Sequence, residues 1–597
     1  MTTKTGTGST SARDVDTAIL GAGLAGLSAS YHLGHPKNSV IFEAKAHYGG
    51  HLFSWQRNGF TWDDGPHISF TMNQYVKDLL AECVNGEYEE VSIQATNYFK
   101  GHWIDHPAQT SLWQIPEPLR TRCLESFIQT ARQQHAPPKN YEEWLHQAMG
   151  PVFADTFPAA YTRKYWTCEP RDLDIDWIGQ RVLRPNYEDV VNSAKGPLPA
   201  GMYYVSDRFP RYPSKGGFLS YCHKLADGAD IRYGMKLVQV DLGKQVLRFT
   251  NGAEVNYRRL VSTIPLPYLI KISTDAPDDV REAAALLRSS QFYRVDVAVN
   301  HPRRRDEIWY YIYDEDKLSV RLSLMERFSP NNAPRDKTAI QVEVYGSAFK
   351  PLPQNPLTVQ TTVVQELLEM GLIDNPAAIE SVHCDLVPTG QIIYDLNRRE
   401  ALRRVNRFLD QCGVLRAGRY SEWKYLMSDA CVLGGRRVAR HLKEMPDDTN
   451  WEGVAITSSD IPDDLIGRPA FLGAHSIGGL VLHIGEAEWF WMKMVVSGHQ
   501  LSDEDKEAPY WDILDDVERV SRNGFTAEFC LHEAAKIRNQ TRDVLFSYND
   551  KDLERVISFE RDGKTTEYNL RWILHHLIDH EAQHKGQIFM LKRLMAL

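Results

Sequence analysis

The most constraining feature of the sequence is a glycine-rich turn near its start, where Gly21, Gly23 and Gly26 follow the apolar run VDTAIL (15–20). The run predicts a buried strand, LAGLSASYHL predicts a helix, and the next strand, SVIFEA, ends on Glu43. Gly21 permits a tight turn, Gly23 lets a pyrophosphate approach the backbone, and Gly26 lets helix pack on strand. The pattern predicts a Rossmann-type unit that binds a dinucleotide, with phosphate at the helix N-terminus and Glu43 accepting from ribose hydroxyls.

A second glycine pair identifies the dinucleotide. Gly49-Gly50 follows Glu43 by six residues, and DDGPHISF (63–70) comes soon after. These segments resemble the flavin amine-oxidase superfamily, in which such a pair lies on the phosphates of FAD. The alternating stretch 230–265 predicts the β-meander that returns the chain to an FAD domain.

A later segment, GRYSEWKYLMSD (418–429), is similar to the last FAD contact of the same superfamily. The resemblance assigns flavin or diphosphate contacts to Gly418 and Arg419, and it places Asp429 beside a helix that aims its N-terminus at the flavin. We therefore expect an α/β FAD domain with a discontinuous α+β substrate domain. The expected boundaries are a disordered 1–13, FAD parts 14–70, 210–268 and 411–445, substrate parts 71–209 and 269–410, and a helical domain over 446–597.

Within the superfamily, several segments resemble UDP-galactopyranose mutase. The resemblance places His67 near the flavin, stacks Trp166 on a nucleotide base, and assigns active-site roles to Arg184, Arg294 and Tyr425. Two arginines over a pocket suit a diphosphate, because guanidinium binds phosphate oxygens bidentately. The implied chemistry is non-redox ring isomerisation of a nucleotide-sugar. The alternative is that these arginines brace the fold or contact FAD.

Other positions depart from the mutase pattern. Trp423 and Met427 stand where the mutases have Tyr and Asp, and Phe209 replaces an expected Tyr. The segment STIPLP (262–267) is more similar to amine oxidases, carotenoid desaturases and protoporphyrinogen oxidases. Flavin oxidation needs little from the protein beyond placing a substrate bond over the cofactor. We therefore favour oxidation or desaturation of a small metabolite, with the mutase as the alternative.

The end of the chain carries HEAQHKGQ (580–587), which satisfies the H-E-x-x-H pattern of zinc proteases. The thirteen residues after His584 contain no His, Glu, Asp or Cys to complete such a site, so a protease is excluded. His580 and His584 still share one helix face, and the best third ligand is His483.

This set resembles the DinB superfamily of four-helix bundles, whose three histidines hold a divalent metal. The resemblance implies zinc or nickel rather than catalytic iron, and it suggests a low-molecular-weight thiol as a partner. A first helix is hard to find before His483, so the bundle either lacks one or borrows one, with residues 431–445 as the candidate. Two roles for the bundle stay open. It could act as a thiol transferase, or it could serve only as an oligomerisation module, for example in a homodimer.

Composition limits the partners. The formal net charge is -10, and about -11 of it falls after Met445, which leaves about +1 before it. This balance argues against nucleic acid and anionic membranes. Eight cysteines without a C-x-x-C pair and a polar start predict a reducing, cytoplasmic setting.

Overall fold

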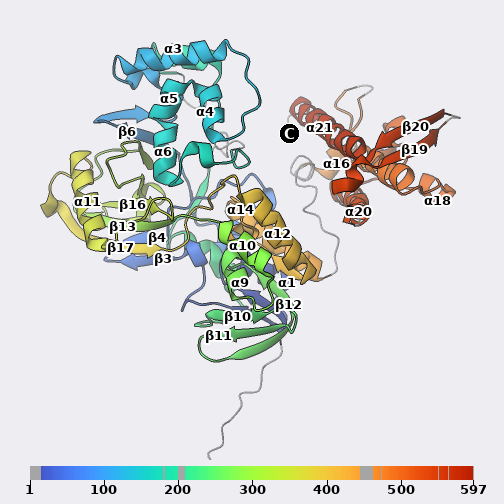
Figure 1. The fold of residues 1–597 in the computed structure, drawn as a ribbon, viewed down its shortest axis with the longest axis horizontal. Helices are drawn as coiled ribbons and strands as arrows, with labels where there is room; N and C mark the ends of the chain where they lie inside the picture. The colour runs from blue at the N-terminus through green and yellow to red at the C-terminus, as the bar shows by residue number, and fades with distance from the viewer. Residues whose placement is uncertain are drawn as a thin grey trace, which may run out of the picture. The chain divides into compact units, whose positions relative to one another are not determined.

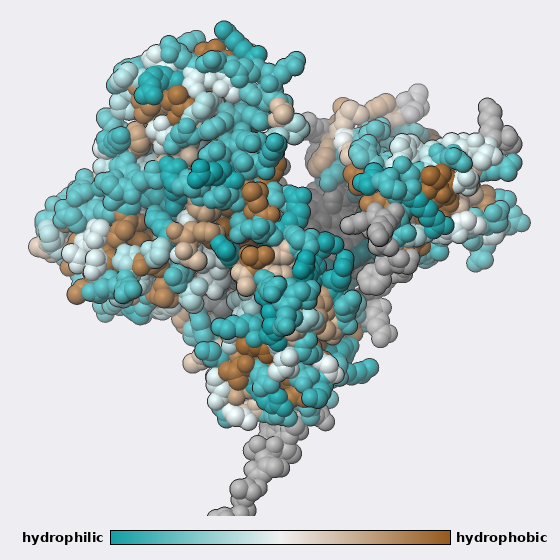
Figure 2. Space-filling view, in the orientation of Figure 1, coloured by the Kyte–Doolittle hydropathy of each residue, from teal (hydrophilic) through white to brown (hydrophobic). Residues whose placement is uncertain are grey.

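The computed structural model describes residues 15–178, 182–198, 209–443, 461–471, 474–546, 548, 550–561 and 564–595. The predicted disordered segment 1–13 lies outside these residues. Internal contacts divide the chain into two units, Met1–Val438 and Ala439–Leu597 (Figure 1). In the described part of the chain, no helix is long and apolar enough to span a membrane. The face seen in Figure 2 is mostly hydrophilic, with hydrophobic residues in small separate groups.

A parallel sheet forms the centre of the predicted FAD domain. Strand β1 (Val15–Leu20) pairs with β2 (Ser39–Phe42) on one side and with β12 (Glu254–Ser262) on the other. The outer neighbours are β9 (Asp230–Arg232) and β18 (Val414–Arg416). Strands from three distant parts of the chain therefore build one sheet, as the sequence predicts.

The predicted meander is also present. Strand β10 (Leu237–Asp241) pairs antiparallel with β11 (Val246–Phe249), and β11 pairs with β12. Gly252 takes the positive φ of 80° that the turn needs.

The substrate domain contains a second sheet of seven strands, in the order β17-β13-β16-β15-β14-β6-β7. The predicted strands IWYYIY, VDVAVN and AIQVEVYG lie in or overlap three of them. Helices of the 71–209 segment form a layer that reaches the sheet through the contact of α6 with β16 (Figure 1). The strands are β6 (Ala95–Phe99), β7 (His102–Asp105), β13 (Gln291–Val299), β14 (Trp309–Ile312), β15 (Arg321–Leu324), β16 (Thr338–Gly346) and β17 (Ile379–Val387); the helices are α3 (Leu119–Ala131), α4 (Tyr141–Met149), α5 (Pro151–Thr156), α6 (Pro158–Tyr165) and α7 (Tyr187–Ser193).

Helix α14 (Ser428–Leu442) packs tightly on α1 (Leu24–Leu33), the helix after the glycine-rich turn. A Cβ on Gly435 would lie 2.6 Å from the backbone nitrogen of Ala29, so only glycine allows this approach. The Ser28 hydroxyl donates to the Val432 carbonyl oxygen at 2.6 Å. The helix that the sequence offers for borrowing from the FAD domain thus packs on α1 of that domain.

The second unit is mainly helical, as predicted, and within its described residues it also contains a β-hairpin. Its described residues include three helices longer than ten residues: α17 (Ile477–Trp489), α20 (Ala527–Phe546) and α21 (Leu570–Leu594). Helix α17 continues as a π-helix over Phe490–Val496. A hairpin of β19 (Val556–Arg561) and β20 (Lys564–Asn569), which we did not predict, precedes α21.

Candidate flavin site and candidate metal centre

The glycine-rich turn is closed so tightly that side chains are excluded from it. Gly21 has φ +96°, and a Cβ there would lie 2.7 Å from Thr263 Oγ1. A Cβ on Gly26 would lie 2.1 Å from the Gly21 carbonyl oxygen, a separation that real Cβ atoms do not show. The turn therefore exposes bare backbone at the start of α1, where N–H groups and the helix dipole favour a phosphate.

The second glycine pair lies directly against this turn. The Gly49 N–H donates to the Ala22 carbonyl oxygen at 2.8 Å, and Gly23 and Gly49 form a parallel bridge. Gly49 and Gly50 have φ of +105° and +58°. Two glycine loops thus form one cradle that a Cβ would fill, and its shape fits a dinucleotide pyrophosphate.

Glu43 joins the two loops from the end of β2. Its Oε2 accepts from the Ala22 N–H at 2.7 Å, and its Oε1 accepts from the Lys45 N–H at 2.8 Å. The carboxylate is buried and orders the turn itself. Its contact with a ribose stays a prediction.

The third predicted FAD segment also meets α1. Gly418 has φ +91°, and a Cβ there would lie 2.7 Å from the Cβ of Ala25. Arg419 donates from Nη2 to Gln391 Oε1 at 2.7 Å, and its guanidinium lies 4.3 Å from the centre of the Tyr425 ring. Asp429 lies in the first turn of α14 and accepts from the Ala430 N–H at 2.7 Å. All three FAD segments therefore converge on one helix N-terminus.

His67 lies near this convergence in a neutral form. Burial lowers its pKa to about 4, and the positive charges of His51 and Arg419 act in the same direction. Its Nδ1 lies 2.6 Å from the Gly65 carbonyl oxygen, so Nδ1 carries the hydrogen and Nε2 carries a lone pair. At physiological pH His67 can accept a hydrogen bond but carries no charge.

Arg294 occupies a different environment from the predicted open pocket. Its side chain is fully buried on β13, and its Nη1, Nε and Nη2 donate to Asp64 (2.9 Å), Asp296 (3.0 Å) and Asp385 (2.5 Å). The guanidinium also lies 3.9 Å from the Trp55 ring centre. Each nitrogen already has a carboxylate, so the structure gives Arg294 the role of a brace and not that of a phosphate ligand.

Two other residues of the mutase resemblance also differ from their predicted settings. Trp166 is 4% exposed and packs on Trp177, with ring centres 4.7 Å apart. A tryptophan buried in this way does not offer a face to a nucleotide base. Arg184 is exposed in the segment before α7. Tyr425 lies 6.0 Å from Trp166 and stays beside the predicted flavin contact Arg419.

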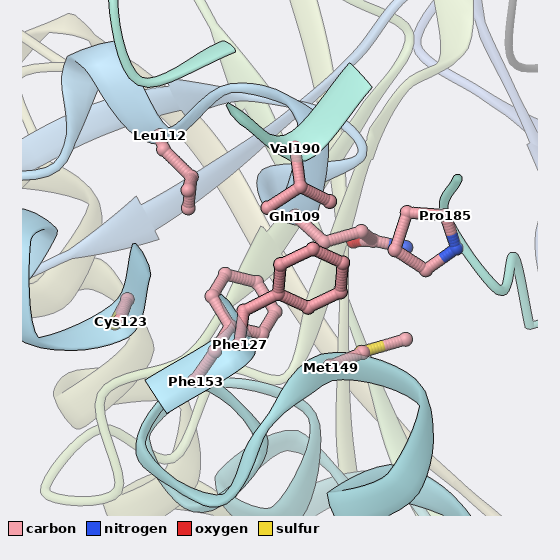
Figure 3. A pocket seen from close by; sticks show the side chains of 8 residues that line it. All are labelled: Gln109, Leu112, Cys123, Phe127, Met149, Phe153, Pro185 and Val190. Carbon is pink, nitrogen blue, oxygen red and sulfur yellow. The ribbon is translucent and has the colours of Figure 1, made fainter. Parts of the chain in front are cut away.

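A cavity in the helical layer is too small for a substrate. Its volume of about 10 Å³ is room for at most one water (Figure 3). Its wall is almost entirely apolar, and its residues are Gln109, Leu112, Cys123, Phe127, Met149, Phe153, Pro185 and Val190.

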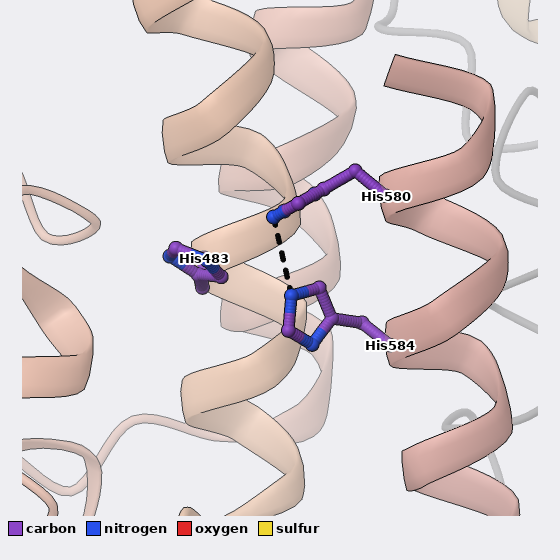
Figure 4. Close-up of side chains that lie close together, drawn as sticks. All are labelled: His483, His580 and His584. Carbon is purple, nitrogen blue, oxygen red and sulfur yellow. Dashed lines mark hydrogen bonds between the residues drawn. The ribbon is translucent and has the colours of Figure 1, made fainter. Parts of the chain in front are cut away.

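The second unit brings the three predicted histidines together. His483 comes from α17, and His580 and His584 come from successive turns of α21, with the rings directed toward one another (Figure 4). One nitrogen of each ring lies within 4.8 Å of the other two. The Nε2 atoms of His580 and His584 are 3.1 Å apart. This spacing fits three ligands of one metal ion.

Two neighbouring side chains hold the rings in the orientation a metal needs. His483 Nδ1 lies 2.9 Å from Glu486 Oε2, and His584 Nδ1 lies 2.7 Å from Gln587 Oε1. An Nδ1–H bonded to an oxygen leaves the Nε2 lone pair to face the centre. Neither residue was predicted, although each stands three positions after its histidine and therefore one helical turn away.

A partly buried ion-pair network ties the metal helices to α20. Arg538 donates from Nε to Glu488 at 2.7 Å and from Nη2 to Glu581 at 2.7 Å. Glu488 is 3% exposed, and Glu581 is the neighbour of His580 in sequence. The network fixes α17 and α21 relative to one another at the level of the three histidines.

Comparisons with known proteins follow the division into two units. Residues 24–442 match the family model "Flavin containing amine oxidoreductase", and residues 447–588 match the DinB superfamily. A 4,4'-diapophytoene desaturase of Staphylococcus aureus (strain Newman) is 30% identical over 90 residues, which is 15% of this chain and only 18% of that enzyme.

Two solved structures share the fold of the first unit. Reduced UDP-galactopyranose mutase superposes with a TM-score of 0.66 at 23% identity, covering 72% of this chain and 96% of the mutase. A putative protoporphyrinogen oxidase from Exiguobacterium sp. 255-15 gives 0.55 at 16% identity, covering 73% of this chain and 100% of that one. With the family match extending over most of its length, the chain belongs to the flavin containing amine oxidoreductase family, and a region that matches the DinB superfamily follows.

Proposed function

We propose that the first unit oxidises or desaturates a small metabolite with FAD. The observation that carries this choice over the sugar mutase is the state of Arg294, which is fully buried with all three nitrogens on carboxylates. A diphosphate substrate needs unpaired guanidinium groups. The partial similarity to a desaturase supports the same choice.

The glycine cradle and the start of α1 would hold the pyrophosphate of FAD, and the bound flavin would supply the two-electron acceptor. The chain's own contribution is to position the substrate and handle its proton. His67 would offer its Nε2 lone pair to a substrate N–H or O–H without adding charge. Arg419, held by Gln391 and Tyr425, would provide a fixed positive charge.

Anaerobic mixing of the purified flavoprotein with amines, phenols, polyenes and nucleotide-sugars tests this function. We expect one class to bleach the flavin absorbance without dithionite. The mutase alternative makes the opposite prediction: no bleaching by any substrate, turnover of a nucleotide-sugar only after prior reduction of the flavin, and severe loss in Arg184→Lys.

We also propose that the second unit binds a divalent metal, zinc or nickel, through His483, His580 and His584. Three imidazoles, two of them oriented by Glu486 and Gln587, suit these ions and leave coordination positions open for water or a thiolate. Metal analysis of the purified protein, compared with His580→Ala, tests the site. Dependence of product yield on an added thiol would favour a transferase role, whereas a metal-free protein with full flavin turnover would favour an oligomerisation module.

A further inference from the structure

The first unit contains a histidine–carboxylate pair that no predicted function uses. His51 follows Gly50 directly, and its Nδ1 lies 3.5 Å from Oδ2 of Asp64. The His51 side chain is 31% exposed, whereas that of Asp64 is 10% exposed. At 3.5 Å this is an ion-pair contact rather than a short hydrogen bond, and the carboxylate lies where it would stabilise a protonated ring. The other edge of the ring is open to solvent or a ligand.

Asp64 is held in place from behind by a buried cation. Its Oδ1 accepts from Nη1 of Arg294 at 2.9 Å, and Arg294 is in turn fixed by Asp296 and Asp385. A neighbouring guanidinium favours the ionised form of a carboxylate. Arg294, Asp64 and His51 therefore form a line from the buried sheet to a partly exposed imidazole.

The exposed end of this line lies among the groups that define the candidate flavin site. The ring of His51 lies 4.9 Å from that of Tyr420, the residue after Arg419. His51 and Asp64 both act electrostatically on His67. The charged or titratable groups that face His51 are thus Asp64, Tyr420 and His67, with Arg294 behind Asp64 and Arg419 beside His67.

We propose that His51 is the proton acceptor of the flavin reaction, with Asp64 and Arg294 as its positioning residues. The inference rests on the proposed oxidoreductase function. When a substrate H–C–X–H becomes C=X, it gives up one hydride and one proton. Bound FAD would supply the hydride acceptor, and the His51 imidazole would take the proton. The imidazolium is stabilised by Asp64 and returns its proton to solvent through its exposed edge. His67 has no carboxylate on its ring, because its Nδ1 is bonded to a carbonyl oxygen.

The test compares His51→Gln, Asp64→Asn and the control His102→Gln, which changes an exposed histidine on β7. Flavin content and visible spectrum are measured first, and the imidazole resonances of flavin-free protein are followed by NMR. We expect normal flavin loading in all variants and a shift of the His51 resonance in Asp64→Asn. Anaerobic flavin reduction should slow by at least about 100-fold in His51→Gln and by up to about 100-fold in Asp64→Asn, with wild-type rates in His102→Gln.

The pH profile and chemical rescue separate proton transfer from a structural role. A proton acceptor on the enzyme gives the rate of flavin reduction a limb that rises with pH, and His51→Gln should lose this limb. Imidazole added to His51→Gly should restore part of the rate. Normal rates and an unchanged pH profile in His51→Gln would overturn the inference, while the proposed oxidoreductase function would stand. Loss of flavin from that variant would overturn the inference in the same way. Failure of every substrate to reduce the wild-type flavin would instead overturn the proposed function.

Discussion

The candidate flavin site is made of backbone, whereas the candidate metal centre is made of side chains. The first collects turns and helices from segments as far apart as Ser28 and Val432, which are 404 positions apart. The second takes three histidines from two helices, two of them a single turn apart. The difference predicts opposite sensitivities: the flavin site should fail when atoms are added to its glycines, and the metal centre should fail when atoms are removed from its histidines.

The largest effect should follow Gly26→Ala. The new Cβ would lie 2.1 Å from the Gly21 carbonyl oxygen, which is backbone and cannot move aside as a side chain would. We expect loss of bound flavin and destabilisation of the first unit by roughly 3 kcal/mol or more. Flavin absorbance per mole of protein measures the bound flavin, and denaturant unfolding measures the stability of the first unit. A variant that keeps its flavin and its stability would show that the turn is not closed as described.

The metal centre should respond to ligand removal by a smaller amount. At free metal about 100 times its dissociation constant, binding adds about 2.7 kcal/mol to the stability of the second unit. His580→Ala should abolish the rise in melting temperature caused by zinc or nickel. The matched control is His575→Ala, because its side chain is 74% exposed and lies outside the triad. Equal metal responses in the two variants would contradict the site.

An acid titration separates the two units further, through His67. Its pKa in the folded protein is about 4, below the ordinary 6.5, so the unfolded chain binds the proton first. Stability from the neutral His67 is therefore nearly complete above pH 6.5 and falls as pH drops toward 4, by about 2.5 kcal/mol at pH 4.5. In His67→Gln, unfolding of the first unit should lose this part of its pH dependence. If the free energy of unfolding changed between pH 7 and pH 4.5 by the same amount in His67→Gln and in the wild type, the burial of His67 would be contradicted.

The sequence predicts those parts of each site that depend on local spacing. Gly21, Gly23 and Gly26 occur within six residues, so a local motif identifies the turn. His580 and His584 lie one turn apart, so helical spacing puts them on one helix face. The sequence could not decide between a substrate-binding and a bracing role for Arg294, because its partners are remote. Asp64 is 230 positions away, and Asp385 faces it only through the register of β13 and β17. No local pattern carries that pairing.

Packing and turns account for the other differences. The burial of Trp166 depends on Trp177 and on how α6 meets the second sheet, neither of which a single sequence reveals. The hairpin of β19 and β20 was detectable, because Asp562-Gly563 separates two runs and Asp-Gly favours such turns. Glu486 and Gln587 were also within reach of helical spacing. The missed residues thus divide into those without a local signal and those whose signal was overlooked.

The smallest predicted effect returns to glycine, in the second unit. Gly586 lies on α21, two positions after His584, and a Cβ built there meets no atom within 4 Å. Gly586→Ala should therefore stabilise the second unit by up to about 1 kcal/mol, because alanine loses less backbone freedom in a helix. Thermal unfolding with and without zinc measures this, and metal affinity should stay unchanged because Gln587 and His584 keep their bond. Destabilisation would mean that the exposed face of α21 is covered in solution. Gly26 and Gly586 would then both resist replacement by alanine, and sensitivity to an added Cβ would no longer distinguish the flavin site from the metal centre.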